Sequence, residues 1–257
     1  MKTSLNTVVS AATNYLRPTL AHPRFRSLPR ATALALAAGL AFSSWAAEPA
    51  GKEKTMAAPT KPTPATAPSP KSPDGWVSLF DGKTLTHWKA TDFGGKGEVK
   101  VAKGEISLGT GYMTGITFTN TNALPRMNYE IELDAKRVDG GDFFCGLTFP
   151  VGKDQCSFVV GGWGGSVVGL SSLDGEDASS NDTTKVMTFQ NGKWYHVHVK
   201  VTPGKIEAWI DDEQMVSIKT EERRVSIRIE MEQCAPLGVA TWSTAAALKD
   251  IRLRKLD

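Results

Sequence analysis

Histidine and cysteine are scarce in this sequence, which holds four histidines and three cysteines among 257 residues. It contains no His-Glu-x-x-His segment, no Gly-x-Ser-x-Gly segment and no glycine-rich phosphate loop. These absences exclude the zinc peptidases, serine hydrolases and nucleotide-binding proteins that are recognised by such motifs. The acidic residues also match no EF-hand spacing, so a calcium sensor of that type is excluded.

Long helical periodicity is also missing from residues 74–257. Short runs that alternate apolar and polar residues recur instead, separated by turn residues. Residues 99–102 and 105–108 flank Lys103-Gly104, and residues 129–136 alternate apolar with charged side chains. Many short strands without intervening helices predict an all-β sandwich or jelly roll.

The first 46 residues are typical of an export signal. Several arginines precede a short apolar run at residues 31–42, which is too short to span a bilayer comfortably. The small residues Ser44 and Ala46 fit a cleavage site before Ala47. The basic segment is long, so an uncleaved signal anchor is the alternative.

Residues 47–73 are rich in proline, alanine and threonine, and this composition predicts an extended linker. One folded domain is then expected at residues 74–257. The sequence places the mature protein in the periplasm or outside the cell, without a membrane span and tethered to the cell surface through the linker.

The charge of the chain is divided unevenly between these parts. Nine of the 30 basic residues but only two of the 27 acidic residues precede Asp74. The domain therefore keeps 21 basic and 25 acidic residues, a net charge of −4. Nucleic-acid binding needs a basic surface, so no nucleic-acid partner is expected.

The segment from Gly141 to Ser172 is apolar and rich in glycine. We interpret it as three antiparallel strands at residues 142–149, 155–161 and 165–171. Alternation places one face of these strands in the core. That face carries Phe143, Cys145, Leu147 and Phe149, followed by Cys156, Phe158 and Val160.

The opposite face of these strands combines small residues with aromatic rings and one acid. It carries Asp142, Phe144, Thr148, Ser157 and Trp163, beside several glycines. Glycine in a strand permits close approach of a ligand, so we interpret this face as the floor of a saccharide-binding groove. The alternative is an ordinary two-sided sheet.

Cys145 and Cys156 stand symmetrically about a turn at Pro150–Val151 and would face each other across it. A disulfide between them is expected in an exported protein, with Cys234 left free. The alternative is two buried thiols that act as small apolar residues.

Residues 194–214 predict the clearest hairpin. A two-residue turn at Pro203-Gly204 pairs Thr202 with Lys205. The apolar side chains then face one another on one side, while His198 faces Trp209 on the other. Two mutually consistent faces support this register.

Two groups of acidic residues are candidates for chemistry. Glu130, Glu132 and Asp134 share one strand face, as the carboxylates of some sandwich-fold glycosidases do. Arg228, Glu230 and Glu232 alternate with apolar residues in the same manner. For both groups, a solvated outer face is the alternative.

Two further groups suggest metal binding. His196 and His198 could ligate a metal with Asp211 on the opposite strand, or could form a surface stripe in which His198 stacks on Trp209. The acidic loop at residues 173–184 offers oxygen ligands for calcium, or is simply solvated.

Five different short motifs follow one another along residues 74–257. They are Val77–Leu85 followed by Trp88, Tyr129–Ile131, Gly192–Tyr195, Ile206–Asp212 and Leu248–Leu256. On these motifs the domain resembles the 3-keto-disaccharide hydrolase family, known earlier as a domain of unknown function. The resemblance implies a concanavalin A-like jelly roll. The central section departs from the family pattern at residues 141–145 and 240–243, and resembles a divergent subfamily of exported planctomycete-type proteins.

The resemblance also implies cleavage of glycosides that carry a ketone at C3. The ketone acidifies the hydrogen at C2, so a base can remove it and the C1 substituent leaves by elimination before water adds back. The candidate bases are Asp142, Glu232 and His198. Arg228 is the candidate partner of the enolate oxygen.

The remaining candidates would bind the saccharide. Trp163, Trp242 and Phe144 would stack on a sugar ring, Asp142 would accept hydrogen bonds from its hydroxyls, and Asp174 lies in the acidic loop that could close one rim of the groove. No cofactor is expected, and a divalent metal stays open as an alternative. The second hypothesis is a non-catalytic carbohydrate-binding or cell-surface interaction module, because one jelly roll serves many functions.

Overall fold

The computed structural model of the chain describes residues 74–257. The expected signal peptide and linker lie outside the described residues. Within residues 74–257 the chain forms fifteen strands and two short 3-10 helices. The strands are β1 (Val77–Ser78), β2 (Trp88–Ala90), β3 (Val99–Ala102), β4 (Glu105–Leu108), β5 (Met113–Phe118), β6 (Tyr129–Gly140), β7 (Cys145–Val151), β8 (Asp154–Gly162), β9 (Val167–Ser171), β10 (Lys185–Val186), β11 (Trp194–Thr202), β12 (Lys205–Ile210), β13 (Glu213–Lys219), β14 (Gly238–Trp242) and β15 (Thr244–Lys255). The 3-10 helices are η1 (Thr121–Ala123) and η2 (Ile229–Cys234).

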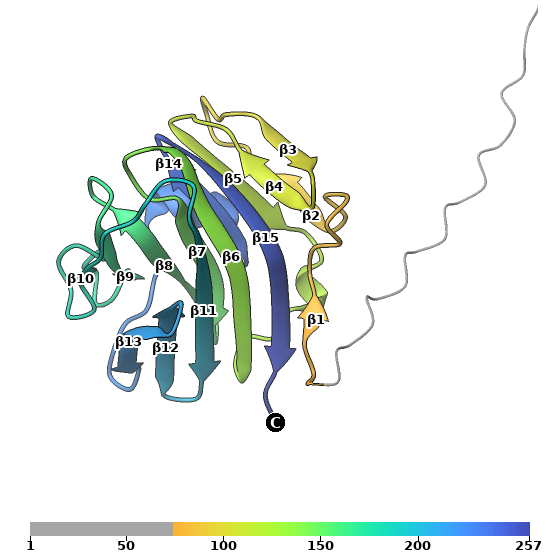
Figure 1. Cartoon of the computed structure of the whole chain (residues 1–257). Coiled ribbons are helices and arrows are strands. Elements are labelled where there is room, and N and C mark those ends of the chain that lie inside the picture. Colours follow the sequence, from red (N-terminus) through yellow and green to blue (C-terminus); the bar gives the residue numbers. More distant parts are fainter. Residues whose placement is uncertain (1–73) are drawn as a thin grey trace, which may run out of the picture. The chain divides into compact units, whose positions relative to one another are not determined.

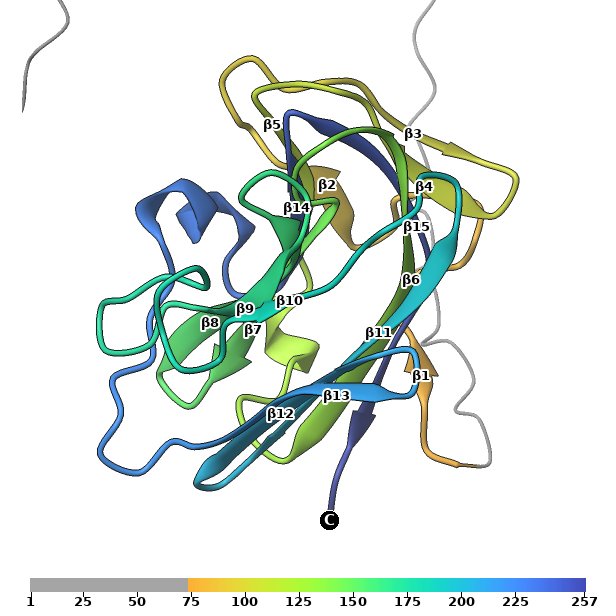
Figure 2. The same ribbon diagram turned by 60° about the vertical axis from the view of Figure 1, so that its left-hand side comes forward.

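The strands form two antiparallel sheets (Figure 1). Sheet A has the order β13-β12-β11-β6-β15-β4-β3, with β1 added to β15. Sheet B has the order β10-β9-β8-β7-β14-β5-β2. Figure 2 shows the two layers, with β7, β8 and β14 in one and β6, β11 and β15 in the other. This is the concanavalin A-like jelly-roll sandwich that the resemblance implies.

Two hairpins form where the alternation predicts them. β3 and β4 have the predicted bounds and pair across Lys103-Gly104, with Ala102 opposite Glu105. The hairpin of β11 and β12 has the predicted register, because Thr202 pairs with Lys205. The rings of His198 and Trp209 stack with centroids 4.8 Å apart. These matches are local, since a turn and its flanking pattern fix each register.

The core lies between the sheets and follows the period of two. From β7 the fully buried side chains are Cys145, Leu147 and Phe149, as predicted. On sheet A they meet the apolar face of β6, which carries Tyr129, Ile131, Leu133 and Ala135.

The prediction was wrong for the two phenylalanines that precede β7. Phe144, predicted on the groove face, is fully buried in the core against Phe189 and Tyr195, with ring centroids 5.1 and 5.8 Å away. Phe143, predicted in the core, lies on the outer side of sheet B. Strand β7 begins only at Cys145, so the alternation does not extend back through residues 141–144.

The predicted disulfide is also wrong. Strand β7 pairs with β8 so that Cys145 faces Val160, and Cys156 faces Phe149. The turn lies at Gly152-Lys153, because Val151 pairs with Asp154, and not at Pro150–Val151. Cys145, Cys156 and Cys234 are free and buried. The two-residue shift of the turn moves the cysteines apart along the hairpin.

The outer face of sheet A carries a network of ion pairs. Glu130 accepts hydrogen bonds from Arg254, and Glu132 from Arg252. Asp134 lies 2.9 Å from Nδ1 of His196. Glu130 and Glu132 are only 5% and 6% exposed, because the partly exposed side chains of Arg254 and Arg252 cover them. These two carboxylates are therefore buried in ion pairs and are not part of a freely solvated outer face.

Among residues 74–257, no helix is long and apolar enough to cross a membrane.

We expect all three thiols to be unreactive in the folded protein. Burial raises the pKa of each cysteine to about 12, so almost no thiolate forms at neutral pH. A disulfide reagent at pH 8 without reductant should label the native protein very slowly. After denaturation it should titrate three thiols. A count of only one thiol would show that two of the cysteines form a disulfide, contrary to the structure.

We expect His196 to make stability depend on pH. Bonding to Glu132, with help from Asp134, raises the pKa of His196 from 6.5 to about 9. Its stabilisation is therefore complete below pH 6.5 and lost as the pH rises to about 9. His196→Gln should cost about 1 kcal/mol at pH 6, a discounted figure because the side chain is partly exposed. At pH 10 the cost should vanish; equal losses at both pH values in denaturant titrations would contradict the assignment.

Candidate functional site

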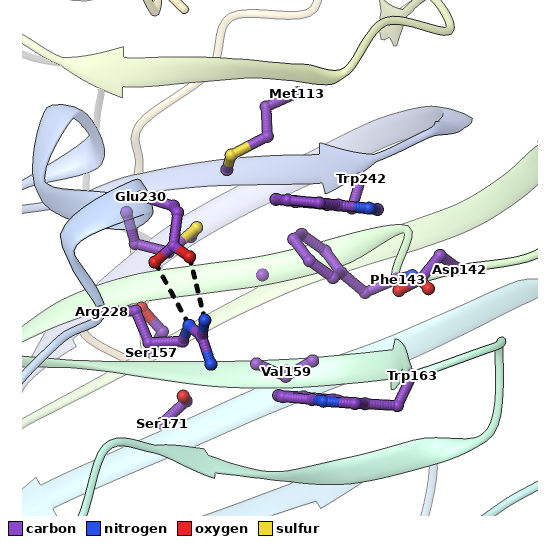
Figure 3. A pocket seen from close by; sticks show the side chains of 12 residues that line it. Met113, Asp142, Phe143, Ser157, Val159, Trp163, Ser171, Arg228, Glu230 and Trp242 are labelled. Carbon is purple, nitrogen blue, oxygen red and sulfur yellow. Dashed lines mark hydrogen bonds and ion pairs between the residues drawn. The ribbon is translucent and has the colours of Figure 1, made fainter. Parts of the chain in front are cut away.

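A cavity of about 250 Å³ lies on the outer side of sheet B (Figure 3). Strands β5, β7, β8, β9 and β14 contribute to it, together with η2 and the segment before β7. Its lining residues are Met113, Asp142, Phe143, Gly146, Ser157, Val159, Trp163, Ser171, Arg228, Glu230, Met231 and Trp242.

Helix η2 forms one wall of the cavity. It packs on the outer face of sheet B through Met231 and Cys234, which form a second apolar cluster with Phe93, Met113 and Ala240. Figure 2 shows this blue turn on the side of sheet B away from β6 and β11. A side chain at Gly146 would meet the Phe143 ring at 3.1 Å and the Met231 methyl at 3.2 Å, so glycine lets both pack on β7.

Two indole rings flank the cavity. Figure 3 shows Trp163 and Trp242 on opposite sides of it, both seen edge-on, with Phe143 beside Trp242. Trp163 is 42% exposed, whereas Trp242 is half-buried between Phe143 and Tyr112. Opposed aromatic faces are suited to an apolar ring face, which many sugars present.

Asp142 holds the turn that carries Trp163. Its carboxylate accepts hydrogen bonds from the backbone N–H groups of Phe143 at 2.7 Å and Gly164 at 3.0 Å. Trp163 has φ of +47°, and Gly164 and Gly165 also have positive φ. Three successive left-handed residues make a tight turn that needs glycine, and Asp142 ties this turn to the start of β7.

The opposite end of the cavity is charged. Arg228 donates to Glu230 through Nε at 3.2 Å and Nη2 at 2.9 Å, and to Asp177 through Nη1 at 2.8 Å. Asp177 belongs to the acidic loop at residues 173–184. One guanidinium thus links that loop to η2, in the forked geometry that suits arginine.

This ion pair also sets the protonation of the site. The hydrogen bonds from Arg228 lower the pKa of Glu230, and those to Glu230 raise the pKa of Arg228. Both groups are therefore charged at neutral pH. Glu230 can accept a proton but cannot act as a resting general acid.

Hydroxyl groups form the floor at this charged end. Ser157 on β8 pairs across the sheet with Thr148 on β7 and with Ser171 on β9. The hydroxyls of Thr148 and Ser157 are hydrogen-bonded at 2.9 Å. All three side chains are buried.

The structure brings together four of the predicted site residues. Asp142, Trp163, Trp242 and Arg228 all line the cavity. The groove-face residue Ser157 also lines it, as the alternation of β8 predicts.

The other predicted site residues lie elsewhere. Glu232 is exposed on η2 and does not line the cavity, because residues 229–234 form a 3-10 helix and not the expected strand. His198 belongs to sheet A, and Phe144 is in the core. Asp174 accepts bonds from the Arg223 side chain at 2.6 Å and the Arg224 backbone at 2.8 Å, and does not line the cavity.

The described residues, 74–257, contain no cluster of three or more His, Cys, Asp or Glu side chains that could hold a metal ion. His196, weighed above as a ligand with His198 and Asp211, is instead paired with Asp134 and Glu132.

Sequence reasoning missed the roles of Glu230, Ser171 and Phe143. Glu230 stood in the expected acidic group, but a strand pattern gave no reason to prefer it to Glu232. In a 3-10 helix these two side chains point in different directions. Ser171 lies opposite the groove residue Ser157 in the pairing of β8 with β9, so it faces the same side of the sheet. The alternation of residues along β9 could therefore have indicated Ser171 as a groove residue.

The sequence profile of one family covers most of the described chain. This family, described as the 3-keto-alpha-glucoside-1,2-lyase-like domain, matches residues 75–254. No curated protein matches the chain.

Solved structures resemble this one at low sequence identity. The Crh5 transglycosylase in complex with NAG has a TM-score of 0.50 and 12% identity, covering 75% of this chain and 88% of that chain. A candidate glycosyl hydrolase from Parabacteroides distasonis ATCC 8503 has a TM-score of 0.46 and 17% identity, covering 71% and 94%. The carbohydrate binding module CBM66 from Bacillus subtilis has a TM-score of 0.44 and 12% identity, covering 66% and 96%. At such identities the likeness shows the fold alone.

We expect Asp142 to be needed for the turn that carries Trp163. Asp142→Ala removes the acceptor of two backbone hydrogen bonds and should lower the free energy of unfolding by about 1–2 kcal/mol. Amide exchange at Gly164 should accelerate as well. Asp139→Ala is the matched control, since Asp139 is exposed on β6. Unchanged exchange at Gly164 in Asp142→Ala would contradict this role.

Proposed function

Because the chain belongs to the 3-keto-alpha-glucoside-1,2-lyase-like domain family, we propose that its cavity on sheet B binds a saccharide and cleaves a glycoside bearing a ketone at C3. One observation carries the proposal: Trp163 and Trp242 flank a cavity whose other end holds the Arg228–Glu230 ion pair. A sugar has the same two-sided character, with an apolar ring face and oxygens at its edge.

The cavity holds groups for each step of the elimination. Glu230 is ionised and takes the C2 proton, and the electron pair of that C–H bond moves toward C3 to form an enolate. Arg228 stabilises the enolate oxygen. The enolate then reforms the C3 carbonyl and a C1–C2 double bond, and the bond from C1 to the glycosidic oxygen breaks. The leaving oxygen takes up the proton that Glu230 removed from C2, which returns Glu230 to its ionised form.

Arg228 has donors available for that oxygen. A guanidinium carries five N–H groups, and three donate to Glu230 and Asp177. The negative partners hold the guanidinium in place and keep it charged, so its position does not have to be organised when the substrate binds.

The alternative is a non-catalytic saccharide-binding module, and one observation favours it. The same ion pair that positions Glu230 lowers its pKa, which makes the carboxylate a weak base. Asp142, the other carboxylate of the cavity, is committed to the turn of Trp163. The two functions share the binding site and differ in whether Glu230 removes a proton.

We also propose that the protein acts outside the cytoplasm. The arginine-rich start, the short apolar run and the small residues before Ala47 support this location. The proline-rich segment at residues 47–73 would then separate the domain from the cell surface.

We expect Trp163→Ala to weaken saccharide binding without unfolding the domain. Loss of a central aromatic contact should cost about 1–3 kcal/mol of binding free energy. The side chain is 42% exposed, so the melting temperature should barely change. Calorimetric titration with 3-keto and ordinary disaccharides, beside a thermal melt, separates the two effects. A large drop in melting temperature with unchanged affinity would show a structural role instead.

We expect Glu230→Gln to separate the two functions. In an enzyme it should slow cleavage of a 3-keto-disaccharide by about 10²–10⁴-fold, the scale of general-base catalysis, while binding persists. Glu232→Gln is the matched control, because Glu232 lies on the same helix outside the cavity. A wild-type protein that binds the glycoside and never cleaves it would assign the chain to the binding modules.

A further inference from the structure

Ser171 is a buried hydroxyl that the fold leaves unsatisfied. Its Oγ has no hydrogen-bond partner within the part of the chain that the structure describes, although the residue is only 1% exposed. Its cross-strand neighbour Ser157 is bonded to Thr148 instead. Of the three neighbouring hydroxyls on β7, β8 and β9, the Ser171 hydroxyl is therefore the one without a hydrogen bond.

Ser171 is a lining residue of the cavity, and Figure 3 shows its side chain at the cavity wall. Folded proteins rarely leave a buried polar group unpaired, because its desolvation is not compensated. At a binding site the compensation comes from the ligand. The position of Ser171 thus indicates where a polar atom of the ligand lies.

The neighbours of Ser171 specify what kind of atom that is. Figure 3 shows Ser171 at the same end of the cavity as Ser157, Arg228 and Glu230. Arg228 only donates hydrogen bonds, and a serine hydroxyl can donate as well. An oxygen placed at this end is therefore offered two donors, which suits a carbonyl group.

We propose that Ser171 donates a hydrogen bond to the C3 carbonyl oxygen of the bound saccharide and thereby sets which edge of the ring enters the charged end. The proposal rests on the saccharide site described above and adds its orientation and a specificity-determining residue. With the carbonyl at Ser171 and Arg228, the apolar ring face lies along the indoles of Trp163 and Trp242.

The carbonyl and the parent hydroxyl differ in their dependence on Ser171. A carbonyl only accepts, so it loses a partner outright when the serine hydroxyl is removed. A hydroxyl at the same carbon can turn its hydrogen toward the carboxylate of Glu230 and keep a bond. Removal of Ser171 Oγ should therefore weaken the keto sugar more than the parent sugar.

The test compares wild-type protein, Ser171→Ala and Ser217→Ala, each titrated with a 3-keto-disaccharide and its parent disaccharide. Ser217 is exposed on β13 of sheet A and provides the matched control. Ser171→Ala should weaken the keto sugar about threefold to tenfold, the scale of one neutral hydrogen bond, and the parent sugar less than about twofold. Its melting temperature without ligand should not fall, because no protein hydrogen bond is lost.

An equal loss for both sugars, or no loss for either, would overturn the role of Ser171 and leave the saccharide site intact. If the wild-type protein binds neither sugar, the proposed function fails and this inference fails with it. A second measurement needs no variant: the wild-type protein should bind the 3-keto sugar more tightly than its 3-deoxy analogue. Equal affinities there would also overturn the proposal.

Discussion

The apolar interface between the two sheets is the constraint on which the rest of the structure depends. Each strand of sheet B must bury one face against sheet A. Alternate residues such as Cys145, Leu147 and Phe149 therefore lie in the core. The residues between them are released to the other face. Ser157 and Val159 reach the cavity because Phe158 is held in the core. Packing thus decides which side chains are available for binding.

Attachment of η2 turns that outer face into a cavity. A sheet alone offers a surface, whereas Met231 and Cys234 bind η2 to it through a separate apolar cluster. Arg228 then joins η2 to the acidic loop through Glu230 and Asp177. The wall is thereby held from both sides by groups that are far apart in the sequence.

The resulting site is divided chemically. Aromatic rings occupy one end, and an ion pair with buried hydroxyls occupies the other. Every carboxylate in it has a partner: Asp142 accepts from Gly164, and Glu230 from Arg228. Among the buried side-chain polar atoms that line the cavity in the described chain, the Ser171 hydroxyl is the one without a partner. These hydrogen bonds hold both carboxylates in fixed positions before any ligand enters the cavity.

The sequence by itself determined the fold class, the parity of most strands and the register of the β11–β12 hairpin, because these depend on neighbours a few residues apart. It also indicated Asp142, Trp163, Trp242 and Arg228 as site residues. Only the tertiary structure decided that Phe143 and not Phe144 lines the cavity, that the cysteines do not face each other, and that Glu230 and not Glu232 pairs with Arg228. These outcomes depend on where β7 begins, where one turn falls and how six residues coil over a sheet. Packing against strands that are distant in the sequence determines these three features. They cannot be predicted from the pattern of neighbouring residues alone.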